Sequence, residues 1–403
     1  MSVGLGPLPA LAPVPGVRLG VACAGIKKPD HPDLTLIELA PGTRIAAVFT
    51  RNRFCAAPVH VAREHLSRTL PRYLLVNTGN ANAGTGARGL EDARRCCRAV
   101  AELTGVDVAA VLPFSTGVIG EPLPVDRMLA GLPACLEDLR EDGWAAAAEA
   151  ILTTDTLPKA CSRTVTLDKG SVRITGMAKG SGMIRPDMAT MLAFITTDAV
   201  VHDVDLDAFL RQAVQVSFNR ITVDGDTSTN DACVLAATAA SNVPLAGDGD
   251  RERFLEALTD LCRELAQAIV RDGEGVTRFI TVAVDGGATE AESEAVAYTI
   301  AHSPLVKTAA FAGDPNWGRI LAAIGRAGID DLAVESVRIW LDDYLIAEHG
   351  GRATGYREEE AARRMAGEEV TIGVDLGRGT ARTTVWTTDL SYEYVRINAE
   401  YRS

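Results

Sequence analysis

The sequence predicts a mixed α/β (α+β) protein with substantial β-sheets. Short apolar runs rich in β-branched residues recur along the chain, and segments with helical spacing of apolar side chains lie between them. Two runs of alternating character, 163–168 and 172–178, flank Lys169 and Gly170, which is typical of a β-hairpin. Strands and helices are interspersed, and no internal repeat or low-complexity linker is found, so the chain falls in the α/β or α+β class.

The first half of the chain contains further strand-like segments and two helical regions. Strands are expected at 44–50, 73–77 and 108–114. Residues 90–104 have the spacing of an amphipathic helix, which Gly105 ends. Helical patterns between 126 and 152 are expected to be broken by Pro133 and Gly143.

The second half is dominated by one long helix and several strands. A helix is expected at 251–272, because its apolar residues recur at helical spacing. These residues are Phe254, Leu255, Leu258, Leu261, Cys262, Leu265 and Ile269. The apolar segment 191–195 has the character of a buried strand. Further strands are expected at 279–284, 336–341, 369–376 and 381–388.

Composition and charge disfavour several classes of protein. Of the 403 residues 47% are hydrophobic, enough for a sizeable core, and the net charge of −13 disfavours binding to nucleic acid or to an anionic membrane. No segment reaches the roughly 18 apolar residues of a membrane span. The N-terminal stretch 1–20 lacks a basic start and contains prolines, so we expect an extended segment and not a secretory signal.

The cysteines and histidines suggest no metal centre. The eight cysteines are scattered and form no C-x-x-C pair, which argues against a zinc site or a disulfide framework. The six histidines fall in no metal-ligand spacing either. We therefore expect no metal, and free, buried thiols in a reducing cytoplasm.

The common nucleotide and hydrolase motifs are absent or misplaced. Residues 84–89, GTGARG, match G-x-G-x-x-G, but the stretch TGNANA separates them from the strand-like segment 73–77. A dinucleotide fingerprint needs these glycines directly at the end of the strand. Neither a P-loop nor a G-x-S-x-G nucleophile elbow is present. A nicotinamide-dependent enzyme is therefore disfavoured, and no cofactor is expected.

Ala189 and Thr190 stand where a glycine-rich loop meets the apolar segment 191–195. A threonine hydroxyl is a poor nucleophile without a base, but cleavage of the peptide bond before Thr190 would give this residue its own base. The new α-amine would have a pKa of about 7.7–8, which suits proton transfer near neutral pH. The chain can make this cut itself: the hydroxyl attacks the preceding carbonyl, the acyl group moves from nitrogen to oxygen, and water hydrolyses the ester.

The neighbouring residues suit this self-cleavage. Small Ala189 leaves its carbonyl open to attack, and Gly180, Gly182 and Pro186 permit or impose an unusual backbone upstream. A simpler interpretation is that a threonine merely begins a strand after a glycine turn. Residue types alone favour the simpler interpretation, because such short patterns carry a high false-positive risk.

Longer motifs reverse that preference. The block KGSGMIRPDMATML, residues 179–192, resembles the cleavage-site block of the ornithine acetyltransferase family, also called ArgJ. Seven further blocks resemble this family in the same order and extend over the whole chain. They are NTGNANAGTG (77–86), STGVIGEPLP (115–124), TTDTLPK (153–159), FNRITVDGDTSTND (218–231), IVRDGEG (269–275), SPLVKTAAFAGDPNWGRILAA (303–323) and TTDLSYEYVRINAEYRS (387–403).

The resemblance implies an N-terminal-nucleophile fold with sheets packed between helices. It also implies self-cleavage into an α piece, 1–189, and a β piece, 190–403. Thr190 would take the acetyl group from N2-acetyl-L-ornithine, and L-glutamate would then collect it, which recycles the acetyl group in arginine biosynthesis. Some members also accept acetyl-CoA, as a substrate and not as a cofactor. The expected partners are these small molecules and, in a cytoplasmic assembly, two α and two β pieces.

The resemblance also implies roles for single residues. Thr116 and Gly117 match the oxyanion-stabilising pair of the family, and a hydroxyl and a flexible backbone N–H are suitable donors to a developing O⁻. The matches to substrate-binding positions are Thr156, Lys179, Thr190, Glu274, Asn398 and Ser403. Lys179 can pair with a carboxylate, and Glu274 with the distal ammonium of ornithine. The C-terminal tail is rich in Tyr, Val and Ile, so we expect it to dock onto the protein.

One position departs from the family pattern, because Asp187 stands where comparable members carry asparagine. A carboxylate three residues before the nucleophile raises the cost of forming an oxyanion nearby. We therefore expect self-cleavage to survive but to be slower than in the variant Asp187→Asn. A time course on denaturing gels measures both rates, and equal rates would refute this expectation.

Two other functions remain open from the sequence. A hydrolase with the same N-terminal nucleophile, an aminopeptidase or amidase, would share the self-cleavage but pass the acyl group to water. An uncleaved binding or structural homologue would stay a single chain of 42.6 kDa. Product analysis with and without glutamate tests the first alternative, and an intact-mass measurement tests the second.

Overall fold

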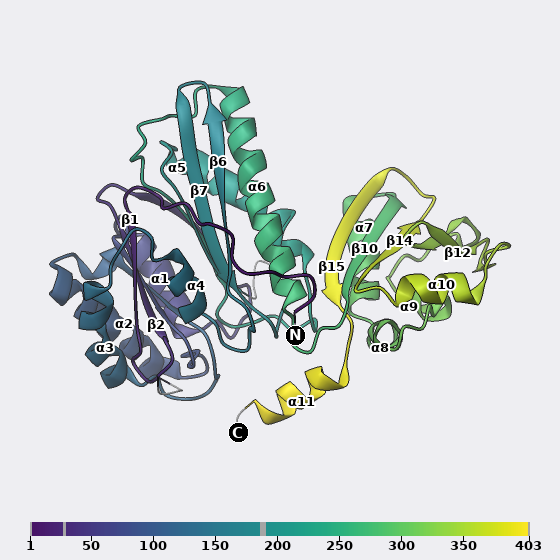
Figure 1. The fold of residues 1–403 in the computed structure, drawn as a ribbon, viewed down its shortest axis with the longest axis horizontal. Coiled ribbons are helices and arrows are strands. Elements are labelled where there is room, and N and C mark those ends of the chain that lie inside the picture. The colour runs from purple at the N-terminus through teal and green to yellow at the C-terminus, as the bar shows by residue number, and fades with distance from the viewer. Residues whose placement is uncertain (1, 27–29, 186–190, 402–403) are drawn as a thin grey trace. The chain divides into compact units, whose positions relative to one another are not determined.

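The computed structural model describes residues 2–26, 30–185 and 191–401, which form two compact units (Figure 1). The larger unit comprises Gly6–Asn219 and Asp226–Ile269, and the smaller one comprises Met1–Leu5, Arg220–Gly225 and Val270–Ser403. The boundary between the two expected pieces, after residue 189, falls inside the larger unit. Both pieces therefore contribute strands to that unit.

The first sheet of the larger unit has the strand order β1-β2-β4-β5. Its strands are β1 (Val17–Ala22), β2 (Leu34–Leu39), β4 (Tyr73–Asn77) and β5 (Val111–Ser115). β4 and β5 are parallel, so the loops that follow them both lie at the end of the sheet formed by the carboxyl ends of these strands. Helices α2 (Gly86–Thr104) and α3 (Val125–Glu137) cover one face, where Cys97, Val100 and Met128 are buried.

The second sheet of the larger unit has the order β3-β9-β8-β7-β6. Its strands are β3 (Arg44–Phe49), β9 (Ala232–Ala237), β8 (Leu192–Thr197), β7 (Gly170–Lys179) and β6 (Lys159–Leu167). One hydrophobic core joins both sheets with α1 (Ala57–Leu66) and α4 (Trp144–Ala150). Phe114 and Phe194 meet edge to face in this core, with ring centroids 5.1 Å apart.

The other face of the second sheet is covered by α5 (Asp203–Gln215) and α6 (Asp248–Arg271), and α6 runs along β6 and β7 in Figure 1. Gly176 of β7 makes this close approach possible, because a Cβ there would lie 3.0 Å from Leu261 Cδ2 of α6. Helices therefore lie on the faces of both sheets. The expectation of a mixed α/β fold with sheets packed between helices is confirmed.

The smaller unit contains one sheet with the order β13-β12-β11-β14-β10-β15. Its strands are β10 (Phe279–Gly287), β11 (Arg338–Leu341), β12 (Tyr344–Glu348), β13 (Gly351–Arg352), β14 (Glu369–Asp375) and β15 (Ala381–Thr388). Its helices are α7 (Glu290–Ala301), α8 (Pro304–Ala312), α9 (Trp317–Gly325), α10 (Glu358–Met365) and the C-terminal α11 (Tyr392–Glu400). The sheet and α7–α10 enclose a separate apolar core.

Most expected elements are present, but two strands begin later than expected. β6 and β7 form the expected hairpin, and α6 is the expected long helix. Residues 108–110 form a 3-10 turn before β5, because the Asp107 side chain accepts the Ala109 N–H at 2.7 Å and caps that turn. A second 3-10 turn at Val334–Ser336, which has no side-chain cap, precedes β11.

Pro133 does not break the helical region as expected, because it lies inside α3. The buried residues Met128, Leu132 and Cys135 of this helix pack against the first sheet. We attribute the intact helix to this packing, which outweighs the roughly 3 kcal/mol that an internal proline costs. Gly143 does separate α3 from α4, since it is the residue before Trp144 at the start of α4.

All eight cysteines are free, but only six are buried. Cys23 is exposed and Cys55 is partly exposed, which corrects the expectation of buried thiols throughout. Burial raises the pKa of the Cys96 thiol to about 12, so this thiol stays protonated at neutral pH. The buried cysteines act as small apolar residues of the core.

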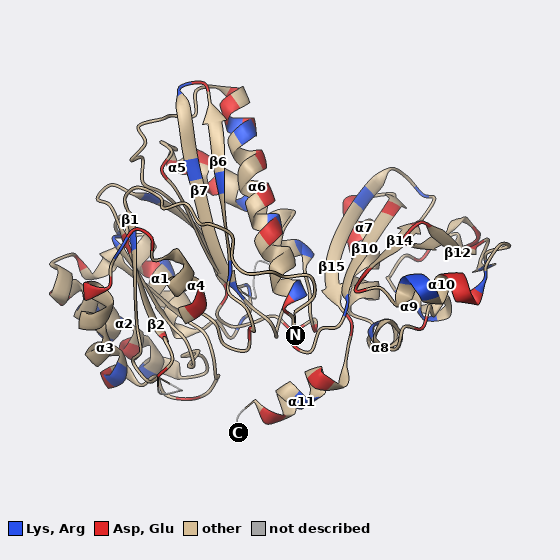
Figure 2. Ribbon diagram, viewed as in Figure 1, with Lys and Arg blue, Asp and Glu red and all other residues tan. Residues whose placement is uncertain are grey.

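The N-terminal segment 2–16 contains neither helix nor strand, in agreement with the expected extended stretch. Its residues 6–16 belong to the larger unit and contact the second sheet, where Thr175 Oγ1 donates to the Ala12 carbonyl at 2.7 Å. Charges of both signs alternate along α6 in Figure 2, so the net charge of −13 is not gathered on that helix. In the described ranges, no helix combines the length and the apolar character that crossing a bilayer requires.

Candidate active site

The candidate active site of the larger unit lies where β7 ends and β8 begins. Lys179, the last residue of β7, is the register partner of Leu192, the first residue of β8. Leu192 stands two residues after Thr190 in the sequence. Thr190 itself, Ala189 and Ser403 lie outside the described residues. The described part of the site is therefore built from the strand ends on either side of the expected cleavage point.

The structure brings two of the sequence-predicted residues, Lys179 and Thr116, into contact. Lys179 Nζ donates to Thr116 Oγ1 at 3.3 Å and to Thr153 Oγ1 at 2.7 Å. An ammonium can only donate, so the Thr116 hydroxyl must act as the acceptor in this contact. Its own O–H then remains available to donate to another oxygen, as an oxyanion-stabilising group must.

Gly117 follows Thr116 in a backbone conformation that requires glycine, with φ +136°. A Cβ at this position would lie 2.3 Å from the Gly79 carbonyl carbon and 2.5 Å from the Asn80 nitrogen. The neighbouring N–H groups are used, since Thr116 donates to Asn77 O and Val118 to Gly79 O. Within the described part of the chain, no acceptor takes the Gly117 N–H. This N–H is therefore suited to bind a developing O⁻.

A buried amide network fixes the loop that holds Thr116 and Gly117. Ser115 Oγ donates to Asn77 Oδ1 at 2.6 Å, which joins the ends of β4 and β5. Asn230 Nδ2 donates to Ser115 O at 2.9 Å and to Ala81 O at 2.6 Å. Asn230 lies two residues before the start of β9, so the network connects the two sheets at the end where the site lies.

The most buried charge at this site belongs to Asp155, which is not among the residues predicted from the sequence. Its carboxylate accepts from Lys159 Nζ at 2.8 Å and from Gly180 N at 2.7 Å, and lies 3.6 Å from Lys179 Nζ. Burial by itself would raise the pKa of Asp155, but Lys159, Lys179 and the Gly180 N–H outweigh it and hold the pKa well below its ordinary value. Asp155 is therefore a carboxylate at any working pH.

Thr156 lies next to Asp155 in the loop between α4 and β6 and is exposed. Thr153, from the same loop, accepts a hydrogen bond from the Lys179 ammonium through its hydroxyl oxygen. The sequence signal for this loop is the resemblance of TTDTLPK, 153–159, to a family block. An acid and a lysine four residues apart would otherwise indicate a solvated surface pair.

The smaller unit holds two other sequence-predicted residues, Glu274 and Asn398, and brings them together. Asn398 Nδ2 donates to Glu274 Oε2 at 2.7 Å, and the Glu274 side chain is largely buried. Helix α11 carries Asn398 and is tied down at its start, where Ser391 Oγ donates to Gly275 O at 2.6 Å. Gly275 has a φ of +68°, and a Cβ there would lie 2.4 Å from the Tyr394 nitrogen, so α11 rests directly on this turn.

The C-terminal helix is docked, as the sequence predicts, although its apolar side chains are not buried. α11 has no buried residue, and Tyr392 and Val395 are 85% and 61% exposed. Polar contacts to the turn beneath hold the helix, together with an edge-to-face contact between the Tyr392 and Phe311 rings, whose centroids are 5.4 Å apart. Another polar contact joins Tyr394 Oη to Asp224 Oδ2 at 3.2 Å.

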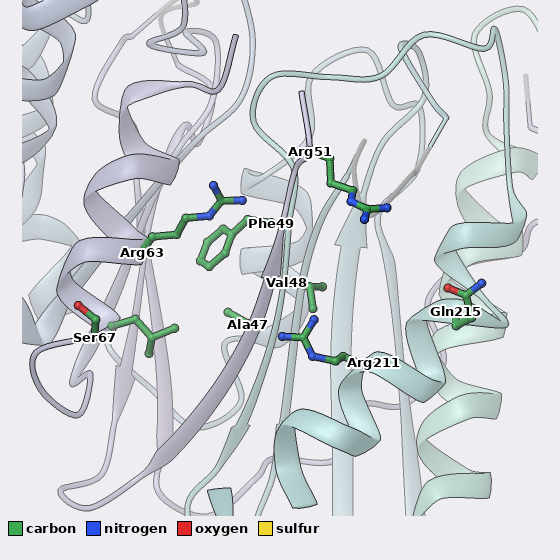
Figure 3. A pocket seen from close by; sticks show the side chains of 9 residues that line it. Ala47, Val48, Phe49, Arg51, Arg63, Ser67, Arg211 and Gln215 are labelled. Carbon is green, nitrogen blue, oxygen red and sulfur yellow. The ribbon is translucent and has the colours of Figure 1, made fainter. Parts of the chain in front are cut away.

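A cavity of about 680 Å³ opens beside the edge strand β3, between α1 and α5 (Figure 3). Arg51, Arg63 and Arg211 line it, but at least two of these guanidinium groups are engaged by the protein. Arg63 stacks over the Phe49 ring, and Arg211 forms two hydrogen bonds to Asp207. None of the sequence-predicted site residues lines this cavity.

A hydroxyl, a glycine N–H and a buried ammonium that meet at one strand end are suited to stabilise the oxyanion of an acyl transfer. Comparison with known proteins agrees with this class of enzyme. The model of the ArgJ family matches residues 18–403. The arginine biosynthesis bifunctional protein ArgJ of Pseudomonas syringae pv. tomato is 56% identical over 406 residues, and that of Pseudomonas fluorescens is 54% identical; both matches cover 100% of each chain.

Two solved structures are also similar. ArgJ from Bacillus halodurans is 42% identical, with a TM-score of 0.48, over 51% of this chain and 96% of that chain. The ornithine acetyltransferase of Mycobacterium tuberculosis, solved with ornithine, is 33% identical, with a TM-score of 0.39, over 45% of this chain and 94% of that chain. The full-length sequence matches show that the chain belongs to the ArgJ family, the bifunctional acyltransferases of arginine biosynthesis that act as ornithine acetyltransferase and glutamate N-acetyltransferase.

Proposed function

We propose that the chain moves an acetyl group from N2-acetyl-L-ornithine to L-glutamate through an acetyl ester on Thr190. In the first half-reaction the Thr190 hydroxyl attacks the acetyl carbonyl, and its α-amine takes the proton. The C–N bond then breaks, the proton passes to the leaving nitrogen, and ornithine departs. In the second half-reaction the glutamate amine attacks the ester, which yields N-acetylglutamate and restores the Thr190 hydroxyl.

The contact between Lys179 and Thr116 carries this proposal. Each half-reaction passes through a tetrahedral oxyanion, and the Thr116 hydroxyl and the Gly117 N–H are the donors that we assign to it. The 3.3 Å contact leaves the Thr116 proton free for this purpose and places a positive charge behind it. Lys179 ends β7 and is paired with Leu192 at the start of β8, which follows Met191 and the proposed nucleophile.

Self-cleavage before Thr190 is proposed to produce the pieces 1–189 and 190–403. β3, β6 and β7 come from the first piece, and β8 and β9 come from the second, yet all five belong to one sheet. The pieces would therefore stay together after the cut. We further propose that two copies of each piece assemble in the cytoplasm and that acetyl-CoA serves as a second acetyl donor.

The remaining residues are proposed to bind the amino-acid part of the substrate. We assign the substrate carboxylate to Lys179, with Thr156 and the terminal Ser403 as further polar contacts. Glu274 and Asn398 are assigned to the distal ammonium of ornithine, because the largely buried Glu274 carboxylate, which accepts from Asn398, supplies a negative charge that suits a cation.

Glu274→Gln is expected to raise the KM for N-acetylornithine by about ten- to a hundredfold, the range for loss of a charged hydrogen bond. Glutamine keeps the shape of the side chain and an acceptor for Asn398, so the unit remains intact. Glutamate has no distal ammonium, and its KM is not expected to rise. Steady-state kinetics with each substrate varied in turn measures both constants. An equal rise in both KM values would contradict this assignment.

Product analysis tests the proposed function against the hydrolase alternative. Purified protein is incubated with N2-acetyl-L-ornithine labelled in the acetyl group, with and without glutamate. We expect label on Thr190 in the absence of glutamate and N-acetylglutamate in its presence. Release of acetate and ornithine at an undiminished rate without glutamate would instead show a hydrolase.

A further inference from the structure

The cavity beside β3 is lined by three cations and by no acid. Its volume of about 680 Å³ falls within the roughly 300–1,000 Å³ that is usual for small-molecule sites. Arg63 enters it from α1, Arg211 from α5 and Arg51 from the segment after β3 (Figure 3). The other lining residues are Ala47, Val48, Phe49, Leu66, Ser67 and Gln215. In a chain with a net charge of −13, such a lining points to an anionic ligand.

Arg63 is the lining cation that is best suited to hold an anion. Its guanidinium stacks over the Phe49 ring, 5.3 Å from the ring centroid, and its Nη2 donates to the Thr50 carbonyl at 2.9 Å. These contacts fix the side chain but do not neutralise its charge. Glu64, its neighbour in the sequence, pairs with other arginines, and within the described residues Arg63 itself forms no ion pair. A guanidinium has five N–H donors in a planar fork that matches phosphate oxygens.

The cavity lies beside the end of the sheet at which β8 begins. Phe49, the last residue of β3, is the register partner of Ala232 in β9, and Ala232 is the register partner of Leu192 in β8. Neighbouring strands lie about 4.8 Å apart, so two strand spacings, about 10 Å, separate Phe49 from Leu192. Leu192 follows the proposed nucleophile by two residues in the sequence. A ligand in this cavity can therefore extend to the reacting end of the sheet.

We propose that this cavity binds the phosphates of an acetyl donor whose leaving group carries them, an acyl thioester such as acetyl-CoA. The inference rests on the proposed use of acetyl-CoA as a second donor and adds a binding site to it. A long flexible arm joins the acetyl group of this molecule to its phosphates, so the phosphates can bind at Arg63 while the thioester reacts with Thr190. The apolar side chains of Ala47, Val48 and Leu66 suit the carbon atoms of that arm.

The chemical step differs from the first half-reaction only in its leaving group. The Thr190 hydroxyl attacks the thioester carbonyl, the C–S bond breaks, and the proton that the α-amine takes passes to the sulfur of CoA. The acetyl ester is the same as the one formed from N2-acetyl-L-ornithine, and glutamate collects it in the same way. The two donors therefore share the nucleophile but not the site of the leaving group, and substitutions in the cavity should affect one donor only.

Titration calorimetry of the cleaved enzyme with CoA tests the site directly. Arg63→Gln is expected to weaken CoA binding about tenfold, as for the loss of a charged hydrogen bond, and Arg63→Lys to recover part of the affinity because it keeps the charge. Ser67→Trp leaves Arg63 in place and fills the cavity from an exposed position at the end of α1, so it should weaken binding by about tenfold or more. Equal affinity in the native enzyme, Arg63→Gln and Ser67→Trp would overturn the proposal, and so would a native enzyme that does not bind CoA.

Arg18→Gln is the matched control for net charge. It removes one positive charge from the same unit, but from β1 and outside the cavity. Its affinity for CoA is expected to stay within about twofold of the native value, because charges far from the ligand are screened. A fall as large as that of Arg63→Gln would reduce the effect to net charge and overturn the proposal.

Two smaller ligands separate the possible sources of the phosphate. Pyrophosphate is expected to compete with CoA and to bind more weakly than CoA. Pantetheine, which lacks the phosphates, is expected to bind equally to the native enzyme and to Arg63→Gln. Pyrophosphate that binds as tightly as CoA would show a site for a free anion and overturn the assignment to an acyl donor.

Steady-state kinetics connects the site to the reaction. Arg63→Gln is expected to raise the KM for acetyl-CoA about tenfold and to leave transfer from N2-acetyl-L-ornithine unchanged. An equal rise in the KM of both donors would overturn the proposal. Failure of the proposed second donor is a separate result, since native enzyme would then bind CoA in the titration yet form no N-acetylglutamate from acetyl-CoA and glutamate.

Discussion

Thr190→Ala is expected to leave the chain as one species of 42.6 kDa and to lower acetyl transfer by about 10⁴-fold or more. The same hydroxyl performs both steps in the proposed mechanism, since it first attacks the Ala189 carbonyl and later the acetyl group. Alanine has no nucleophile for either step. Intact-mass measurement follows the cleavage, and formation of N-acetylglutamate follows the activity.

The matched control is Thr190→Ser, which keeps the hydroxyl but lacks the methyl group that restricts its rotation. This variant is expected to retain part of the cleavage and of the activity. A new N-terminus at position 190 in the alanine variant, or acetyl transfer by the uncut chain, would show that another residue is the nucleophile.

Thr116→Val is expected to lower kcat by about 10²–10³-fold, the usual cost of losing one oxyanion donor. Valine matches the shape of threonine and cannot donate, so the loop after β5 should keep its form. The KM values should change little, because the lost hydrogen bond forms only in the transition state. Steady-state kinetics on the fully cleaved variant measures both effects.

Thr116→Ser provides the control, since it restores a hydroxyl at the same position and should recover most of kcat. An unchanged kcat in the valine variant would remove Thr116 from the oxyanion hole. A loss of cleavage in the valine variant, with cleavage retained in the serine variant, would extend the role of this hydroxyl to the maturation step.

Much of the fold and part of the site follow from the sequence because their signals are local. The hairpin of β6 and β7 follows from two alternating runs around Lys169 and Gly170, and α6 from apolar residues at helical spacing. Thr116 and Lys179 follow from motifs that surround them in the sequence. The contact between Thr116 and Lys179 cannot be predicted from these motifs, because β5 and β7 belong to different sheets.

The burial of Asp155 could not be predicted, because it is a property of the assembled fold. In the sequence it is an acid in a loop, four residues before a lysine, and such a pair usually lies on the surface. Only the packing of this loop under the ends of β6 and β7 removes its carboxylate from water. Strands β2 and β9 were missed for a related reason, since short apolar runs do not distinguish strands from helices.

The pairing of β7 with β8 has a consequence for the life of the enzyme. These strands are hydrogen-bonded neighbours from Ile174 and Thr197 to Lys179 and Leu192, and the proposed cut falls in the segment that connects them. In the uncut chain this tether keeps both strands at a high effective concentration. After the cut, complete denaturation releases two polypeptides that must find each other by diffusion, so renaturation becomes a second-order process. Maturation would therefore give a working catalyst that folds easily only once, while its halves are still joined.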